Sequence, residues 1–149
     1  MNEAAVPVWI FFLTPLWIGG WITASILYRR SRGKPIFPRT PDGALYSERM
    51  ASGANNSHWL GRIGGASRCL IVSVTSGREL IITPYFPFNL MFLPEIYGLE
   101  VRAPASSVRE IKAQRWLFMD SLVIDLGDGR SFRLFLRDPV AFRQALERR

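Results

Sequence analysis

AAVPVWIFFLTPLWIGGWITASILY, residues 4–28, is an unbroken run of 25 residues without a charged side chain. As an α-helix, which rises about 1.5 Å per residue, this run would be roughly 37 Å long. The hydrocarbon core of a bilayer is about 30 Å thick, so the run is long enough to cross it once. The run is apolar on every side, which argues against a helix that packs only one face on a soluble core. It therefore predicts a membrane-spanning helix.

Four basic residues follow the run directly: Arg29, Arg30, Arg32 and Lys34. Lys and Arg beside a span stay on the cytoplasmic side of the membrane. We therefore expect residues 1–28 to form an anchor in the inner (plasma) membrane, with the N-terminus outside and the rest of the chain in the cytoplasm. A signal peptide is the alternative, but it would have a basic segment before a shorter apolar core and a small-residue cleavage site. Here the only charged residue before the run is Glu3.

One strip of the expected helix carries small residues beside large rings. It comprises Gly19, Gly20, Thr23 and Ala24, with Trp17 and Trp21 alongside. Gly20 and Ala24 are four residues apart, a spacing that lets two membrane helices approach closely. Small residues are also common in membrane helices in general. The strip favours packing on a membrane-protein partner or on a second copy of this chain.

Composition excludes several classes of function. The basic cluster and Glu3 contribute +3 of the net charge of +7, so the rest of the chain carries +4, spread along its length. A nucleic-acid-binding protein would need a dense basic patch, so we expect no nucleic-acid partner. The single cysteine, Cys69, and the single histidine, His58, allow neither an intramolecular disulfide nor a Cys/His zinc site in one chain.

No catalytic pattern is found in the sequence. Cys69 lies in an apolar run, which predicts a buried, inert thiol. His58 has no sequence neighbours that mark it as a general base. The carboxylates show no spacing typical of paired acids, and the glycines do not match a phosphate-binding loop. We therefore expect no metal, no cofactor and no enzymatic activity.

The remaining chain divides into a linker and a β domain. Residues 29–57 contain Pro35, Pro38 and Pro41 and predict a basic juxtamembrane linker. From residue 58 to 149 the apolar residues alternate with period two, which predicts strands. The expected strands cover residues 59–63, 68–74, 79–83, 99–103, 108–114, 122–126 and 132–136. Asp138 and Pro139 then predict the start of a helix whose apolar face is Phe142, Ala145 and Leu146.

This order of elements is similar to that of a known family. The residues that carry the likeness are the strand pair 68–74 and 79–83, the turn Pro87-Phe88-Asn89-Leu90, the late hairpin around Gly127-Asp128-Gly129, and Asp138-Pro139. Over residues 59–147 the chain resembles bacterial membrane-anchored pleckstrin-homology-like (PH-like) domain proteins. The resemblance implies a mainly β fold, a small antiparallel barrel of about seven strands closed by a C-terminal helix. An SH3-like or OB-type barrel is an alternative, although neither predicts the closing helix.

Lipid-binding members of that family carry paired basic residues across the first hairpin. Here Arg62 and Arg68 flank the turn Gly64-Gly65, but Leu70 stands where the resemblance implies a second basic residue. The resemblance therefore does not imply phosphoinositide recognition, and Arg62 and Arg68 predict at most a weak anion site.

The most apolar stretch after the anchor is residues 85–93, Tyr-Phe-Pro-Phe-Asn-Leu-Met-Phe-Leu. A half-buried strand would place Phe88 and Leu90 on its core face and would not need a second apolar face. Tyr85, Phe86, Met91 and Leu93 are thus a candidate docking surface. We expect a single-pass accessory or scaffolding protein that docks on a membrane-protein partner. The alternative is a tethered module that binds anionic lipid headgroups.

Overall fold

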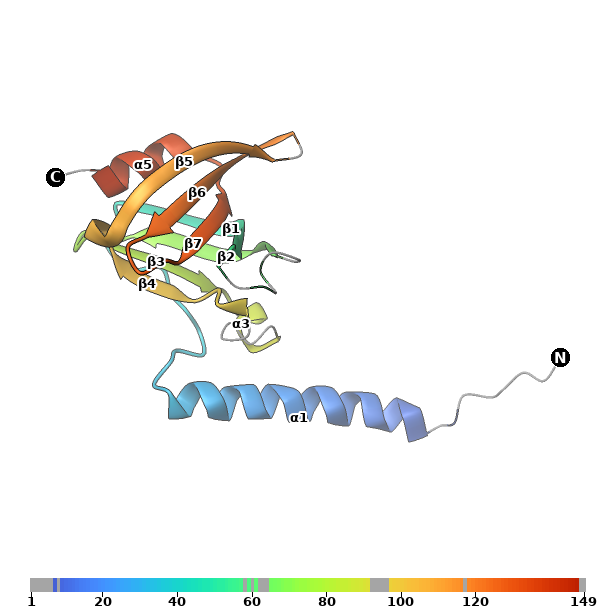
Figure 1. Cartoon of the computed structure of the whole chain (residues 1–149). Coiled ribbons are helices and arrows are strands. Elements are labelled where there is room, and N and C mark those ends of the chain that lie inside the picture. Colours follow the sequence, from blue (N-terminus) through green and yellow to red (C-terminus); the bar gives the residue numbers. More distant parts are fainter. Residues whose placement is uncertain are drawn as a thin grey trace. The chain divides into compact units, whose positions relative to one another are not determined.

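The computed structural model describes residues 7, 9–57, 59, 61, 65–91, 97–116 and 118–147, apart from the side chain of residue 116. The chain divides into two compact units, Met1–Ile36 and Phe37–Arg149, coloured along the sequence in Figure 1. Each unit is described by itself.

The first unit is the helix α1 (Trp9–Ser31). It is long and apolar enough to cross a membrane, criteria that a signal sequence near the N-terminus also meets. The helix ends where Gly33 adopts a φ of 64°. The Lys34 backbone N–H then donates to the Arg29 carbonyl at 2.9 Å, and that of Gly33 donates to Arg30 at 3.1 Å. These two bonds satisfy carbonyls of the last turn in a Schellman cap.

The second unit is a seven-stranded antiparallel sheet in the order β4-β3-β2-β1-β7-β6-β5. Its strands are β1 (Tyr46–Asn55), β2 (Ala66–Val74), β3 (Glu79–Pro84), β4 (Val101–Pro104), β5 (Val108–Trp116), β6 (Met119–Leu126) and β7 (Ser131–Phe135). The short helix α3 (Phe88–Met91) follows β3, the 3₁₀ turn η1 (Ala105–Ser107) joins β4 to β5, and α5 (Pro139–Glu147) ends the described chain. The number of strands and their antiparallel pairing agree with the prediction.

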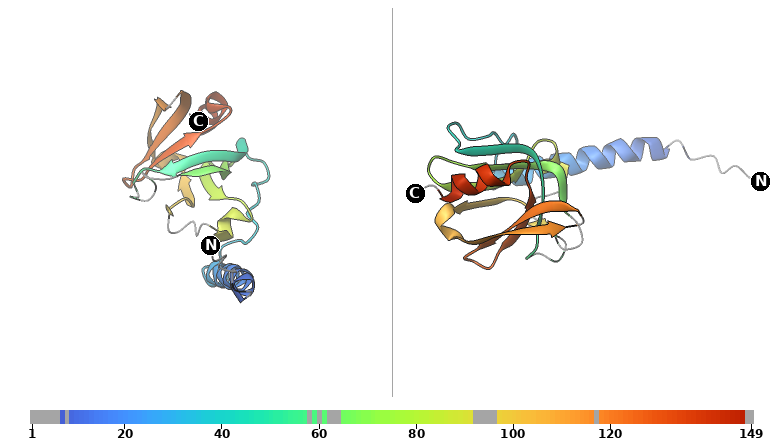
Figure 2. Two further views of the ribbon diagram at one scale, coloured as in Figure 1. Left: turned by 90° about the vertical axis from the view of Figure 1, so that its right-hand side faces the viewer. Right: turned by 90° about the horizontal axis from the view of Figure 1, so that it is seen from above.

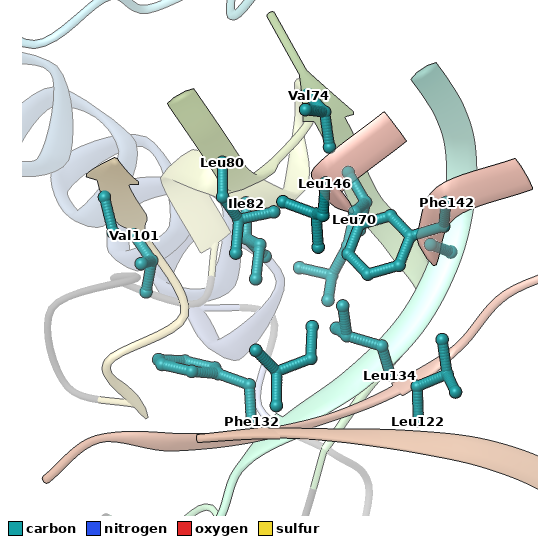
Figure 3. Close-up of a cluster of buried hydrophobic side chains, with 14 of the residues drawn as sticks. Leu70, Val74, Leu80, Ile82, Val101, Leu122, Phe132, Leu134, Phe142 and Leu146 are labelled. Carbon is teal, nitrogen blue, oxygen red and sulfur yellow. The ribbon is translucent and has the colours of Figure 1, made fainter. Parts of the chain in front are cut away.

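The core lies inside the bend of the sheet and is closed at one end by α5. Asp138 caps this helix, since its carboxylate accepts the Ala141 N–H at 2.8 Å. Phe142 is completely buried, and its ring packs in a T-shaped arrangement with that of Tyr46 at a centroid distance of 5.3 Å. Figure 2 shows α5 at the end of the bent sheet, and Figure 3 shows Phe142 and Leu146 among side chains from β2, β3, β6 and β7. The predicted helix and its apolar face are confirmed.

The hydroxyl of Tyr46 ties the start of β1 to the segment before α5. It donates to Glu48 at 2.6 Å, and the same carboxylate accepts the Arg137 backbone N–H at 3.0 Å. Burial, together with the bond to Glu48 and that carboxylate's negative charge, raises the pKa of Tyr46 above its ordinary value. The phenol is therefore held in its neutral form.

The predicted linker was wrong over residues 46–55, which form β1 in the middle of the sheet. This strand is rich in small and polar residues, so it lacks the apolar alternation by which strands are recognised. Its inward positions include Ala51 and Gly53. A Cβ at Gly53 would lie 2.7 Å from Leu134 Cδ2, so the strand contributes space rather than apolar surface to the core. Tertiary packing, and not intrinsic β-propensity, determines that such a segment forms a strand.

Two further expectations were wrong. The first strand was placed at residues 59–63, yet Trp59 and Gly61 are helical, and residues 58, 60 and 62–64 lie outside the described part. The sheet is also open, not closed into a barrel: in the described chain, β4 and β5 are its edges. β4 is short and ends at Pro104, which has no N–H to extend a ladder. Instead, α5 covers the end of the core with buried side chains.

Candidate functional site

An apolar hollow of about 320 Å³ lies on one face of α1, and we call it the helix hollow. It is lined by Leu13, Leu16, Trp17, Gly20, Trp21 and Ala24. Four of the six residues predicted for helix packing thus come together. The other two, Gly19 and Thr23, do not line it; Thr23 Oγ1 donates to the Gly19 carbonyl at 2.8 Å within the helix.

The floor of the helix hollow is a glycine with free space above it. A Cβ at Gly20 would meet nothing within 4 Å. The Trp17 and Trp21 side chains beside it are 72% and 42% exposed. Because large rings stand next to a missing side chain, the surface is concave and can receive a protruding side chain.

The four basic residues after the span do not act alike. Arg29 donates from Nε and Nη2 to the Pro35 carbonyl, at 3.2 and 3.0 Å, and so fixes the chain as it leaves the helix. The guanidinium of Arg32 lies 5.5 Å from the centre of the Tyr28 ring, a cation–π distance. Arg30 and Arg32 are exposed, and Lys34 is half-buried. The exposed charge of the cluster is therefore carried mainly by Arg30 and Arg32.

Residues 88–91 of the predicted docking block form the helix α3, where a strand was the simpler interpretation. Leu90 and Asn89 of α3 are buried, whereas Met91 is 55% exposed. Phe86 is 44% exposed, and its ring lies 4.8 Å from that of Phe37, which is itself 62% exposed. Met91 ends α3, which begins two residues after Phe86, and we call the three exposed residues Phe37, Phe86 and Met91 the apolar ledge of the second unit.

Tyr85, another predicted docking residue, is half-buried and makes contacts within the domain. Its hydroxyl donates to the Arg68 carbonyl at 3.0 Å, and its ring packs edge-on against Phe88 at 5.2 Å. Tyr85 thus has packing contacts within the domain, and its part in docking stays a prediction. Leu93, the fourth predicted docking residue, lies outside the described residues.

The predicted anion site is described only in part. Arg68 is exposed at an irregular point of β2, with a φ of 52°, and its backbone N–H donates to Ser52 Oγ at 2.9 Å. Arg62 and His58 lie outside the described residues. The pairing of Arg62 with Arg68 therefore stays a prediction.

Cys69 is buried as predicted, with 4% of its surface exposed. It lines a second hollow of about 300 Å³ with Gly65, Ala66, Ser67, Phe88, Tyr97 and Leu99. Burial raises the pKa of the Cys69 thiol above its ordinary value, which keeps it protonated and weakly nucleophilic. Over the described ranges, no three His, Cys, Asp or Glu side chains are grouped so that they could hold a metal ion.

Sequence analysis missed one exposed apolar feature, the turn between β5 and β6. Phe118 is 90% exposed and has a φ of 74°, and Met119 is 56% exposed. The signal was present: Trp116-Leu117-Phe118-Met119 is an uncharged apolar run between Arg115 and Asp120. It was overlooked because this hairpin lacks the Gly, Asn or Asp by which hairpin turns are recognised.

Compared with known proteins, the chain matches no protein-family model and no curated protein sequence. The geometry of these surfaces is therefore the guide to what the chain does.

Proposed function

We propose that this chain is a single-pass membrane accessory protein whose helix and β domain dock on a membrane-protein partner. The observation that carries the proposal is the helix hollow, a concave apolar surface on a helix long enough to span a bilayer. In lipid, helices associate through close packing and not through the hydrophobic effect, so a concave strip beside rings is suited to a second helix. A helix that served only as an anchor would not need this shape.

The second unit supplies the other half of the proposed contact. In this proposal it is a PH-like domain, supported by its seven antiparallel strands and the helix that covers one end of the core. The apolar ledge is the surface we propose for the partner, because Phe37, Phe86 and Met91 expose large apolar side chains that the core does not use. The orientation we propose has the N-terminus outside the inner membrane and this domain in the cytoplasm, supported by the basic residues in the last turn of α1 and directly after it.

A matched pair of glycine variants tests the proposal. Gly20→Ile places a branched side chain in the helix hollow, whereas Gly19→Ile places it on a neighbouring position where a Cβ also meets nothing within 4 Å. Tagged full-length protein is extracted from native membranes, and both co-purifying proteins and differently tagged copies of the chain are quantified. Gly20→Ile should lower the recovery of the partner about tenfold, the effect of losing about 1.4 kcal/mol.

Gly19→Ile should retain the partner at close to the parent level. Equal recovery with the two variants would contradict a role for the helix hollow. The ledge is tested in the same way with Phe86→Ser plus Met91→Ser, against Tyr85→Phe as a change in the framework. A folded ledge variant that keeps its partner would remove the ledge from the proposed interface.

The alternative function, a lipid-headgroup-binding module, is supported by the exposed Arg30 and Arg32 after the span. Ionic strength separates the two functions. Attraction between Arg and lipid phosphates weakens as salt is raised, whereas an apolar contact does not. Partner retention that persists in high salt would favour docking over headgroup recognition.

A further inference from the structure

The outer half of the β5–β6 hairpin projects beyond the sheet. Every described side chain from Lys112 to Asp120 is exposed, whereas Ser121 and Leu122 are buried. The strands remain paired to the end of the hairpin, with Arg115 opposite Asp120 and Trp116 opposite Met119. Figure 1 shows this hairpin extending past the other strands. The projecting part therefore contributes little to the core.

The residues at the tip of this hairpin are not the ones that a two-residue turn favours. Only two residues, 117 and 118, separate the closing pair Trp116 and Met119. Two-residue hairpin loops favour Asn and Gly because the backbone requires positive φ. Phe118 adopts a φ of 74°, a conformation that costs free energy for a residue with a side chain, and its ring is 90% exposed. Neither folding nor turn geometry explains a phenylalanine here.

We propose that Phe118 and Met119 insert into the lipid–water interface of the membrane that α1 crosses, so that the β5–β6 hairpin is a second membrane contact of this chain. The inference rests on the proposed function in one respect, that α1 spans the membrane. Aromatic rings are favoured at the level of the headgroups, and apolar side chains gain free energy when they leave water.

The short tether between α1 and the second unit favours lipid as the occupant. The chain from the end of α1 at Ser31 to the second unit at Phe37 is six steps long, so its reach is at most about 20 Å. The domain is thus tethered close to any bilayer that holds α1. The charges on this part of the hairpin balance, because Lys112 Nζ lies 2.8 Å from Glu110 Oε2 and Arg115 stands opposite Asp120, so the tip brings no net negative charge to an anionic bilayer.

The test uses the full chain in vesicles of phosphatidylcholine and phosphatidylglycerol that contain doxyl-labelled lipids. A fluorescent NBD label is attached to single cysteines in a Cys69→Ser background, at Met119→Cys for the tip, Ser76→Cys for another exposed hairpin turn, and Ile18→Cys for α1. We expect lipid quenching of the label at 119, little quenching at 76, and strong quenching at 18. Quenching at 18 without quenching at 119 would overturn the inference and leave the tip for a protein.

The two proposals fail in distinguishable ways, because an unquenched label at 18 would refute the span itself. Phe118→Gly, combined with the label at 119, then tests the ring. Glycine suits the positive φ, so this variant should fold at least as well as the parent, yet the ratio of quenched to unquenched label should fall about tenfold or more. Undiminished quenching in Phe118→Gly would show that the ring does not hold the tip in lipid.

Discussion

Replacing Phe142 with alanine should lower the stability of the β domain more than any substitution of an exposed residue in the same helix. The Phe142 ring is completely buried and lies 5.3 Å from the Tyr46 ring, edge to face. Truncating a buried phenylalanine costs about 3–5 kcal/mol, the sum of lost transfer free energy and the cavity left behind. Of this, about 0.5–1.5 kcal/mol belongs to the aromatic pair. A small domain is stable by only about 5–15 kcal/mol, so the loss is a large fraction of the total.

The measurement is thermal unfolding of the full chain in mild detergent, followed by the circular dichroism of the sheet. For a domain of this size, 1 kcal/mol shifts Tm by about 4 °C, so Phe142→Ala should lower Tm by about 12–20 °C. Val140→Ala is the matched control, because Val140 lies in the same helix and is 64% exposed. It should leave Tm unchanged or raise it slightly, since alanine favours helix. If the two variants melt together, α5 does not close the core and the argument from Phe142 fails.

Three further predictions follow from single residues. The pKa of Tyr46 is raised above its unfolded value of about 10, so its stabilising effect is present below that pH and is lost as pH rises above it. The free energy of unfolding should therefore fall more steeply above pH 10 in the parent than in Tyr46→Phe, as measured by urea unfolding. Gly98→Ala should destabilise more than Gly129→Ala in the same assay, because both have positive φ but only at Gly98 would a Cβ lie 2.5 Å from Asn55 Nδ2. In vesicles, Gly20→Ile should reduce energy transfer between labelled copies if the helix hollow mediates self-association, and unchanged transfer would exclude a second copy as its occupant.

The elements that were predicted correctly are those whose structure is determined by their own residues. The strands at 68–74 and 122–126 are short runs rich in Val, Ile and Leu, and the β6–β7 turn carries glycine and aspartate where a turn requires them. In that turn Arg130 donates to the Asp128 carboxylate from Nε at 2.6 Å and from its backbone N–H at 3.0 Å. The hydrogen bond from the Arg130 side chain, and to a smaller extent the one from its backbone N–H, holds the pKa of Asp128 below its ordinary value. Local chemistry of this kind is visible without a structure.

The elements that were missed depend on contacts between distant residues. β1 is a strand because Gly53 fits against Leu134, more than eighty positions away in the chain. No pattern in the neighbouring sequence predicts that contact. The helix hollow was partly foreseen, since the four-residue spacing of Gly20 and Ala24 is visible in the sequence. The bond from the Tyr85 hydroxyl to the Arg68 carbonyl is likewise a contact between distant residues that cannot be inferred from sequence.

Shape distinguishes the helix hollow from the hairpin tip and assigns them different occupants. The hollow is concave, and a concave apolar surface gains most from a solid partner whose side chains fill it, because unfilled space forfeits dispersion contacts. The Phe118 side chain protrudes from the hairpin tip, and fluid lipid can surround such a ring without a complementary pocket. The two surfaces should therefore act independently. Gly20→Ile should leave lipid quenching at position 119 unchanged, and Phe118→Gly should leave partner recovery unchanged. A variant at one surface that abolished the readout of the other would show that both belong to a single interface.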